Sequence, residues 1–118
     1  MQSIHTSDSF HTMIAAPELT IAVFKADWCG DCKYIDPFMP EVEQQYSDRL
    51  RLVEVDVDGV GEVSQQQNIM GIPSFVAYTN GKELIRFVNK ARKSRQEIEQ
   101  FLERAVEVYK ALNAQAAE

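Results

Sequence analysis

Cysteine is scarce in this chain of 118 residues, which holds only Cys29 and Cys32. They lie close together in the run ADWCGDCK, and a disulfide between them would stabilise the fold little, because the gain grows with the number of residues enclosed. A structural zinc ion takes about four ligands, and the histidines that could complete a site, His5 and His11, lie far from any second ligand pair. The scarcity therefore argues against a disulfide framework and against a metal site.

Positive charge and long apolar runs are also in short supply. The formal net charge is −6, and because nucleic acids and anionic membranes both favour a basic surface, we expect neither as a partner. No uninterrupted apolar run is long enough to span a bilayer. The opening residues, MQSIHTSDSFHTMI, lack the basic and apolar regions of a signal peptide, so we expect a cytoplasmic protein whose thiols are kept reduced.

What is present is the pattern of one globular domain over residues 1–118, with 45% hydrophobic residues and no repeat, linker or low-complexity tract. Hydrophobic periodicity predicts four helices, at Ser9–Ala15, Gly30–Tyr46, Glu62–Asn68 and Ser94–Leu112. It predicts four strands, at Leu19–Ala26, Leu50–Val57, Ser74–Thr79 and Glu83–Val88. Parallel crossovers are right-handed and hairpins antiparallel, so we expect an α/β fold: a central mixed sheet of four to five strands with helices on both faces.

Local signals refine three of these elements. Pro37 lies inside the second helical pattern, and because proline removes a hydrogen bond and crowds the preceding turn, we expect a kink there. Asn80-Gly81 joins the last two strands, and both residues tolerate the positive φ of a tight hairpin. Ser94 and Glu97 have the spacing of a capping box, which predicts the start of the last helix.

The two cysteines fall at the carboxyl end of a buried strand, on the first turn of a helix, where open α/β sheets place reactive groups. Unpaired amides and the helix dipole favour an anion at the helix start, so Cys29 is the predicted nucleophile in disulfide exchange. Cys32 lies one turn further on the apolar stripe and is the predicted resolving thiol. Gly30 suits a loop that another backbone must approach closely. A pair of ordinary packing cysteines is the alternative.

The run WCGDCK resembles the active-site motif W-C-G-P-C-K of the thioredoxin family. GIPSF, at residues 71–75, resembles the second hallmark of that family, and NGK matches its hairpin. Pro37 lies at the family's helix-kink position. The resemblance is clearest over residues 21–101, and the order and spacing of these motifs are highly specific for the fold.

The resemblance implies a thioredoxin fold in which the Ile72–Pro73 bond is cis and faces the cysteines. Trp28 and Pro73 would form a platform for the substrate, the Ile72 backbone would pair with an extended segment of it, and Gly30 and Asp31 would complete the binding surface. The implied function is a monomeric thiol–disulfide oxidoreductase that reduces protein disulfides without a cofactor.

The electron donor would be a separate reductase or a low-molecular-weight thiol, since the chain has no nucleotide-binding fingerprint. Two alternatives stay open. One is the reduction of mixed disulfides between proteins and small thiols, as glutaredoxin-like proteins do. The other is a non-catalytic interaction module with the same fold.

The chain departs from the family at a buried pair of charges. The family usually has an aspartate six residues before the first cysteine and a lysine on the neighbouring strand, where this sequence has Val23 and Glu54. We hypothesise that Glu54 supplies the missing carboxylate and accepts the proton of Cys32 when the mixed disulfide is resolved. If Glu54 instead points into solvent, the proton leaves through water.

Two further departures concern charge around the cysteines. Asp31 replaces the proline of the motif and should repel a nearby thiolate, which would destabilise the reduced form and make the couple a stronger reductant. Asn89 stands where the family has glycine, and it is followed by the basic residues Lys90, Arg92 and Lys93. These could narrow or charge the docking groove, or form a solvated basic edge.

Overall fold

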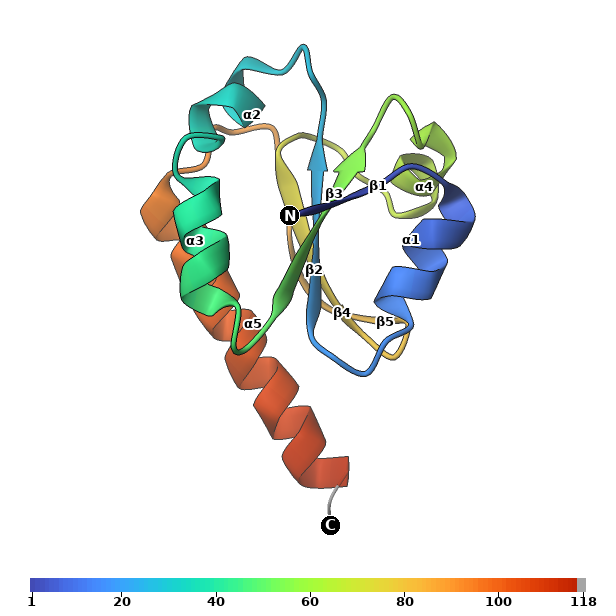
Figure 1. The fold of residues 1–118 in the computed structure, drawn as a ribbon, viewed down its shortest axis with the longest axis vertical. Coiled ribbons are helices and arrows are strands. Elements are labelled where there is room, and N and C mark those ends of the chain that lie inside the picture. Colours follow the sequence, from blue (N-terminus) through green and yellow to red (C-terminus); the bar gives the residue numbers. More distant parts are fainter. Residues whose placement is uncertain (117–118) are drawn as a thin grey trace.

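A computed structural model of the protein describes residues 1–116, so the last two residues of the expected domain lie outside the described part. The strands are β1 (Gln2–Ile4), β2 (Thr20–Lys25), β3 (Arg51–Asp56), β4 (Ser74–Thr79) and β5 (Lys82–Phe87). The helices are α1 (Ser7–Ile14), α2 (Gly30–Ile35), α3 (Met39–Tyr46), α4 (Gly61–Gln66) and α5 (Arg95–Ala116). Figure 1 shows the helices flanking one central sheet.

The strands form a mixed five-stranded sheet in the order β1-β3-β2-β4-β5. The central strand β2 runs parallel to β3 and antiparallel to β4, and the β4–β5 hairpin closes one edge. Every residue of β2 except Lys25 is buried, as expected for a strand covered on both faces. The predicted mixed sheet is therefore confirmed, and its central strand leads directly to the two cysteines.

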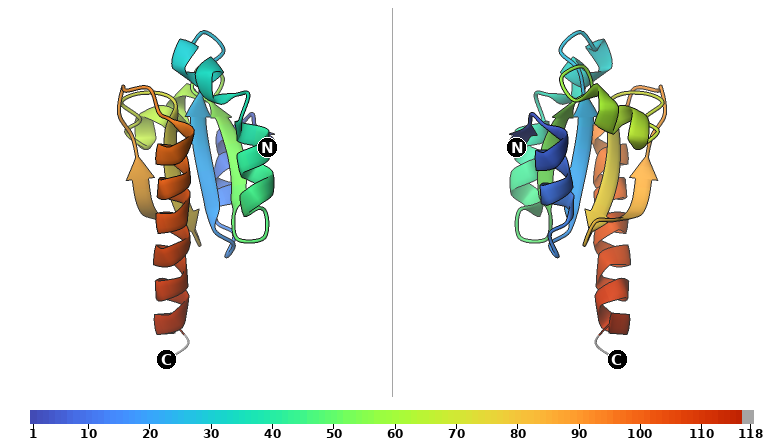
Figure 2. Two further views of the ribbon diagram at one scale, coloured as in Figure 1. Left: turned by 90° about the vertical axis from the view of Figure 1, so that its left-hand side faces the viewer. Right: turned by 90° about the vertical axis from the view of Figure 1, so that its right-hand side faces the viewer.

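Helices cover both faces of the sheet and enclose two hydrophobic cores. On one face α3 and α5 pack against buried side chains that include Ile21, Leu52 and Phe75. On the other face α1 and α4 pack against a second set that includes Phe24 and Val55. Figure 2 shows the two layers edge-on, with α5 running along one face and past the end of the sheet. Across residues 1–116, none of the helices combines the length and apolarity that a membrane span requires.

The structure corrects the prediction of one kinked helix over residues 30–46. The helix is interrupted at residues 36–38, so that α2 and α3 are separate. Pro37 has no amide hydrogen to donate, and the amide of Phe38 bonds instead to the carbonyl oxygen of Ile35, three residues back, at 3.2 Å. A second proline, Pro40, lies in the first turn of α3, where it is tolerated because that amide needs no helical partner.

The prediction also missed β1, which has only three residues, two of them exposed. A strand this short shows no periodicity, and it is held by parallel pairing with β3, which no local pattern reveals. The predicted hairpin and helix start are confirmed. Asn80 and Gly81 have φ of 52° and 78°, and Ser94 and Glu97 exchange two hydrogen bonds of 3.1 Å at the start of α5.

Candidate active site

The two thiols lie where β2 gives way to α2. Cys29 is the N-cap of α2, and its Sγ accepts a hydrogen bond from the backbone amide of Cys32 at 3.2 Å. This bond satisfies one of the amides that a helix start leaves unpaired, and it favours negative charge on the Cys29 sulfur. Cys29 is 6% exposed and lines a surface groove, whereas Cys32 is 1% exposed beneath it. Of the two sulfurs, that of Cys29 is therefore the more accessible from the groove.

Burial also affects how readily the inner sulfur, that of Cys32, loses its proton. Burial raises the pKa of the Cys32 thiol above its ordinary value, and its interaction with Cys29 raises it further. The charge of Lys25 acts in the opposite direction and favours the Cys32 thiolate. The raised pKa favours the protonated form of Cys32, so formation of its thiolate would require a proton acceptor.

The segment before β4 faces the cysteines. The Ile72–Pro73 peptide bond is cis, Pro73 is buried, and the Ile72 carbonyl oxygen lies 3.8 Å from Cys29 Sγ. Gly71 lies so close to the segment between β5 and α5 that a Cβ there would approach Asn89 O to 2.2 Å. Only glycine allows these two segments to meet beside the cysteines.

The active-site groove, of about 430 Å³, is formed by these segments and is lined by Trp28, Cys29, Gly30, Asp31, Met70, Gly71, Ile72 and Lys90. Trp28 and Met70 are 69% and 72% exposed, and they form an apolar rim around the groove. Trp28 is nevertheless anchored, since its Nε1 donates a hydrogen bond to Asp58 Oδ2 at 2.7 Å. The groove gathers the predicted substrate-binding residues except Pro73, which is buried next to Ile72. Sequence reasoning missed Met70 and Asp58, which belong to loops without a recognisable pattern.

The negative charge of Asp31 is not free to act on the thiols as the sequence argument assumed. Arg92 Nε donates a hydrogen bond to Asp31 Oδ1 at 2.9 Å, and the guanidinium lies over the ring of Tyr34 at 4.4 Å from its centre. The ion pair and the cation–π contact bind the segment before α5 to α2. Repulsion of the Cys29 thiolate by Asp31 is therefore offset by Arg92, which is 61 positions away in the sequence.

Glu54, the candidate proton acceptor, is half-buried and paired rather than pointing into solvent. Lys25 Nζ donates to Glu54 Oε1 at 2.7 Å and to Asp36 Oδ1 at 2.5 Å. Burial disfavours the charged form of Lys25, but the hydrogen bonds that its ammonium donates to the two carboxylates hold its pKa above the ordinary value overall. The three side chains line a charged pocket of about 260 Å³ behind α2, together with Ser3, Ile4, His5, Ala26, Asp27, Lys33 and Asp56. Sequence reasoning found Glu54 but missed Lys25, a lysine at the end of an otherwise buried strand.

Lys93 is fully buried, so the expectation of a solvated basic edge is wrong for this residue. Its Nζ donates to three acceptors, Asn89 O at 3.2 Å, Asn89 Oδ1 at 3.1 Å and Ala91 O at 2.9 Å. These acceptors match the three hydrogens of an ammonium group and explain how a charge is tolerated in the interior. Lys93 thus fixes the segment that meets Gly71.

The sequence model of the thioredoxin family matches residues 2–104. The chain belongs to the thioredoxin family. Thioredoxin 1 of Plasmodium falciparum is 41% identical over 85 residues, which cover 71% of this chain and 81% of that protein. Thioredoxin-1 of Saccharomyces cerevisiae is 34% identical over 83 residues, covering 70% of this chain and 80% of that protein. A solved structure of Plasmodium falciparum thioredoxin matches with a TM-score of 0.78 at 32% identity, covering 88% of this chain and 98% of that chain.

The family and the site agree with each other. The chain has the thioredoxin fold and is a thiol–disulfide oxidoreductase with protein-disulfide reductase activity. Other relatives are named as mitochondrial or chloroplastic thioredoxins, so membership of the family does not determine where this protein acts.

Proposed function

We propose that this protein is a cytoplasmic, monomeric reductase of protein disulfides, with Cys29 as nucleophile and Cys32 as resolving thiol. The observation that carries the proposal is the unequal placement of the two sulfurs. Cys29 caps α2 at the floor of the active-site groove, and Cys32 is shielded one turn behind it. Trp28 and the Ile72–Pro73 segment offer an extended substrate its platform.

The proposed reaction has two exchange steps. The Cys29 thiolate attacks one sulfur of the substrate disulfide, an S–S bond forms between them, and the other substrate sulfur leaves as a thiolate that takes up a proton. Cys32 then loses its proton and attacks Cys29 Sγ, which releases the second substrate thiolate. The substrate gains two electrons and two protons, and the protein is left with a Cys29–Cys32 disulfide.

The dithiol itself carries both electrons, so the proposed reaction needs no cofactor. A separate reductase or a low-molecular-weight thiol returns the protein to its reduced form. The proton of Cys32 is proposed to leave through the charged pocket, where the Lys25 ammonium favours the thiolate and Glu54 holds that ammonium in place. Glu54 thereby acts through Lys25 as a positioning residue, and it is also the proposed final proton acceptor.

A trapping experiment tests the proposed function. A Cys32→Ser variant, mixed with a disulfide-linked peptide pair, should stop at the first step and accumulate a covalent adduct on Cys29 that dithiothreitol releases. The control variant carries both Cys29→Ser and Cys32→Ser and should form none. If the parent protein, supplied with dithiothreitol, does not accelerate peptide reduction and Cys32→Ser forms no adduct, the catalytic reading is wrong and an interaction module is favoured.

A further inference from the structure

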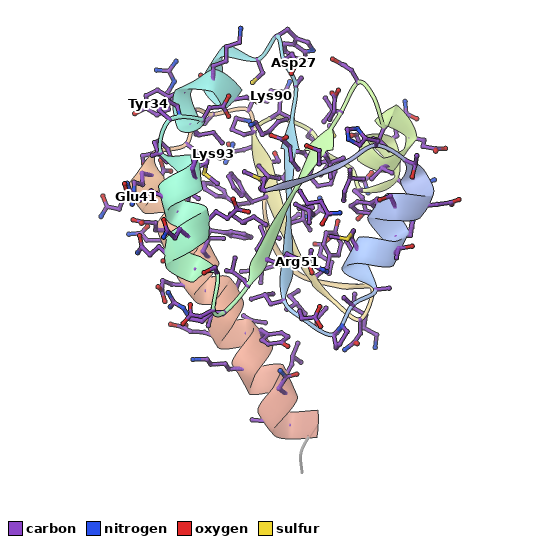
Figure 3. The ribbon with its side chains drawn as sticks, in the orientation of Figure 1. Asp27, Tyr34, Glu41, Arg51, Lys90 and Lys93 are labelled. Carbon is purple, nitrogen blue, oxygen red and sulfur yellow. The ribbon has the colours of Figure 1, made fainter. Side chains whose placement is uncertain are left out.

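The three basic side chains between β5 and α5 have three different environments. Lys93 is buried and bound to backbone oxygens within its own segment. Arg92 is committed to Asp31 and to the face of Tyr34. Lys90 is exposed and lines the active-site groove. Figure 3 labels Lys90 and Lys93 toward the end of the molecule where α2 lies.

Among the lysine, arginine, aspartate and glutamate side chains that line the groove in the described part of the chain, only Lys90 is unpaired. Asp31, the other charged residue of its lining, is occupied by Arg92, and within residues 1–116 no side chain forms an ion pair or hydrogen bond with Lys90. Asp58, next to the groove, already accepts the indole hydrogen of Trp28. A bound segment therefore meets an apolar rim at Trp28 and Met70 and an uncompensated ammonium at Lys90.

The segment that bears Lys90 is held in place rather than loose. Lys93 ties together Asn89 and Ala91, the residues on either side of Lys90, and the Asn89 backbone lies against Gly71. The side chain of Lys90 thus starts from a fixed point on the groove that contains Cys29. Fixed placement reduces the ordering cost of a charge pair with a ligand.

We propose that Lys90 selects substrate disulfides that carry an acidic side chain two residues from the attacked cysteine. This inference rests on the proposed function and names the substrate class of the same site. In an extended segment, side chains two residues apart point to the same side and are separated by about 6–7 Å. A cysteine facing Cys29 therefore directs the side chain two positions away along the same groove. An aspartate or glutamate there meets Lys90, and a lysine or arginine is repelled.

The net charge of the whole molecule opposes a preference for acidic substrates, so such a preference can arise only from charges near the groove. A net charge of −6 disfavours acidic ligands in general. A preference for an acidic substrate must then come from the groove. A solvent-exposed ion pair of this kind changes rates by about two- to fivefold, and added salt reduces the effect.

The test uses two disulfide-linked peptides that differ only in glutamate or lysine two residues from the attacked cysteine. The measurement is the ratio of their second-order rate constants with the reduced parent protein, which we expect to favour the glutamate peptide by about two- to fivefold at low salt. Lys90→Gln should bring the ratio to one or below, because the net negative charge of the molecule then acts alone, and Lys90→Glu should lower the ratio further, so that the lysine peptide reacts faster. Lys82→Glu is the matched control, because it makes the same charge change at an exposed position of β5 that does not line the groove.

Each outcome has one meaning. If both peptides react at equal rates with the parent, or if the ratio is unchanged in Lys90→Glu, the role of Lys90 is disproved while reductase activity stands. If Lys82→Glu moves the ratio as much as Lys90→Glu does, the whole-molecule charge is responsible and the proposal is also disproved. If the parent reduces neither peptide, the proposed function itself fails.

Discussion

At the scale of single residues, the ion pair between Asp31 and Arg92 controls how the residue between the cysteines affects them. Asp31 alone would destabilise the Cys29 thiolate, and Arg92 cancels much of that effect from outside the motif. The two residues lie 61 positions apart, so the chemistry of the short motif depends on a distant part of the chain.

The pair predicts a pattern of reduction potentials. Arg92→Gln exposes the charge of Asp31, destabilises the reduced form and should lower the potential by about 5–20 mV, because exposed pairs contribute little energy and 30 mV corresponds to about 1.4 kcal/mol. Asp31→Asn leaves Arg92 unpaired and should raise it by a similar amount. Equilibration with a glutathione buffer measures both, with Arg104→Gln, an exposed charge on α5, as control. Equal potentials in all four proteins would remove the charge argument.

The role of Glu54 is tested by the pH dependence of the resolution step. Glu54→Gln keeps the shape of the side chain but cannot accept a proton, so resolution of a preformed mixed disulfide on Cys29 should slow by about tenfold or more. Asp36→Asn is the matched variant, because it removes the other carboxylate bound to Lys25. Slowing in both variants assigns the effect to the charge state of Lys25. A parental rate at every pH in Glu54→Gln shows that the proton leaves through water.

At the scale of elements, the segment between β5 and α5 is organised by one buried ammonium. Burial lowers the pKa of Lys93 below its ordinary value of about 10.4, against the opposing charges of Asp31 and Glu97. As pH rises through the interval between the lowered and the ordinary value, the unfolded chain binds more protons than the folded one. The contribution of this group to the free energy of unfolding therefore increases with pH in that interval.

A Lys93→Met variant isolates this contribution, since methionine fills the space of the stem without a charge. The free energy of unfolding of the parent minus that of the variant should rise with pH below about 10.4 and level off above it. Denaturant titrations at several pH values measure this difference. The backbone amides of residues 89–92 should also exchange hydrogen faster in the variant, because Asn89 and Ala91 lose their shared donor. A difference independent of pH would mean that the pKa of Lys93 is the same in the folded and the unfolded protein, so that burial does not lower it.

Elements with a strong periodic pattern could be predicted from the sequence, and those made by distant contacts could not. The mainly apolar run that contains residues 20–25 and the Asn80-Gly81 turn are local signals, and both elements were predicted. The strand β1 is held by its pairing with β3, which leaves no local pattern in the sequence. The presence of Pro37 does not by itself determine whether a helix bends or ends, so the break at residues 36–38 was not predicted. In the site, the motif located both cysteines, but the partners Arg92, Lys25 and Asp58 come from other segments.

At the scale of the whole molecule, three phenylalanines join the hairpin to the last helix. Phe75 in β4 lies 6.4 Å from Phe87 in β5 and 6.2 Å from Phe101 in α5, measured between ring centres. Phe75 is fully buried and neighbours the Pro73 segment in sequence, so the same cluster supports both the core and the groove.

Phe75→Ala should lower the free energy of unfolding by about 3–5 kcal/mol, the usual cost of a large aromatic cavity. Leu112→Ala is the control, because Leu112 is an exposed leucine on α5 and its loss should change stability by less than about 0.5 kcal/mol. Chemical denaturation of the reduced proteins provides the comparison. Similar losses in the two variants would show that the aromatic cluster is not the centre of the core.

The far half of α5 has a practical consequence. Among residues 95–115 its last buried side chain is Val106, and Tyr109 still contacts the body of the molecule through a hydrogen bond that its hydroxyl donates to Pro17 O at 2.9 Å. The helix continues to Ala116 at the end of the molecule opposite α2 (Figure 1). With a rise of about 1.5 Å per residue, the seven residues after Tyr109 form a stalk of about 10 Å. A fluorophore, a surface linker or a fused reporter attached to this stalk would lie far from the two cysteines. The stalk is therefore a suitable attachment point for measuring disulfide exchange on an immobilised or labelled protein.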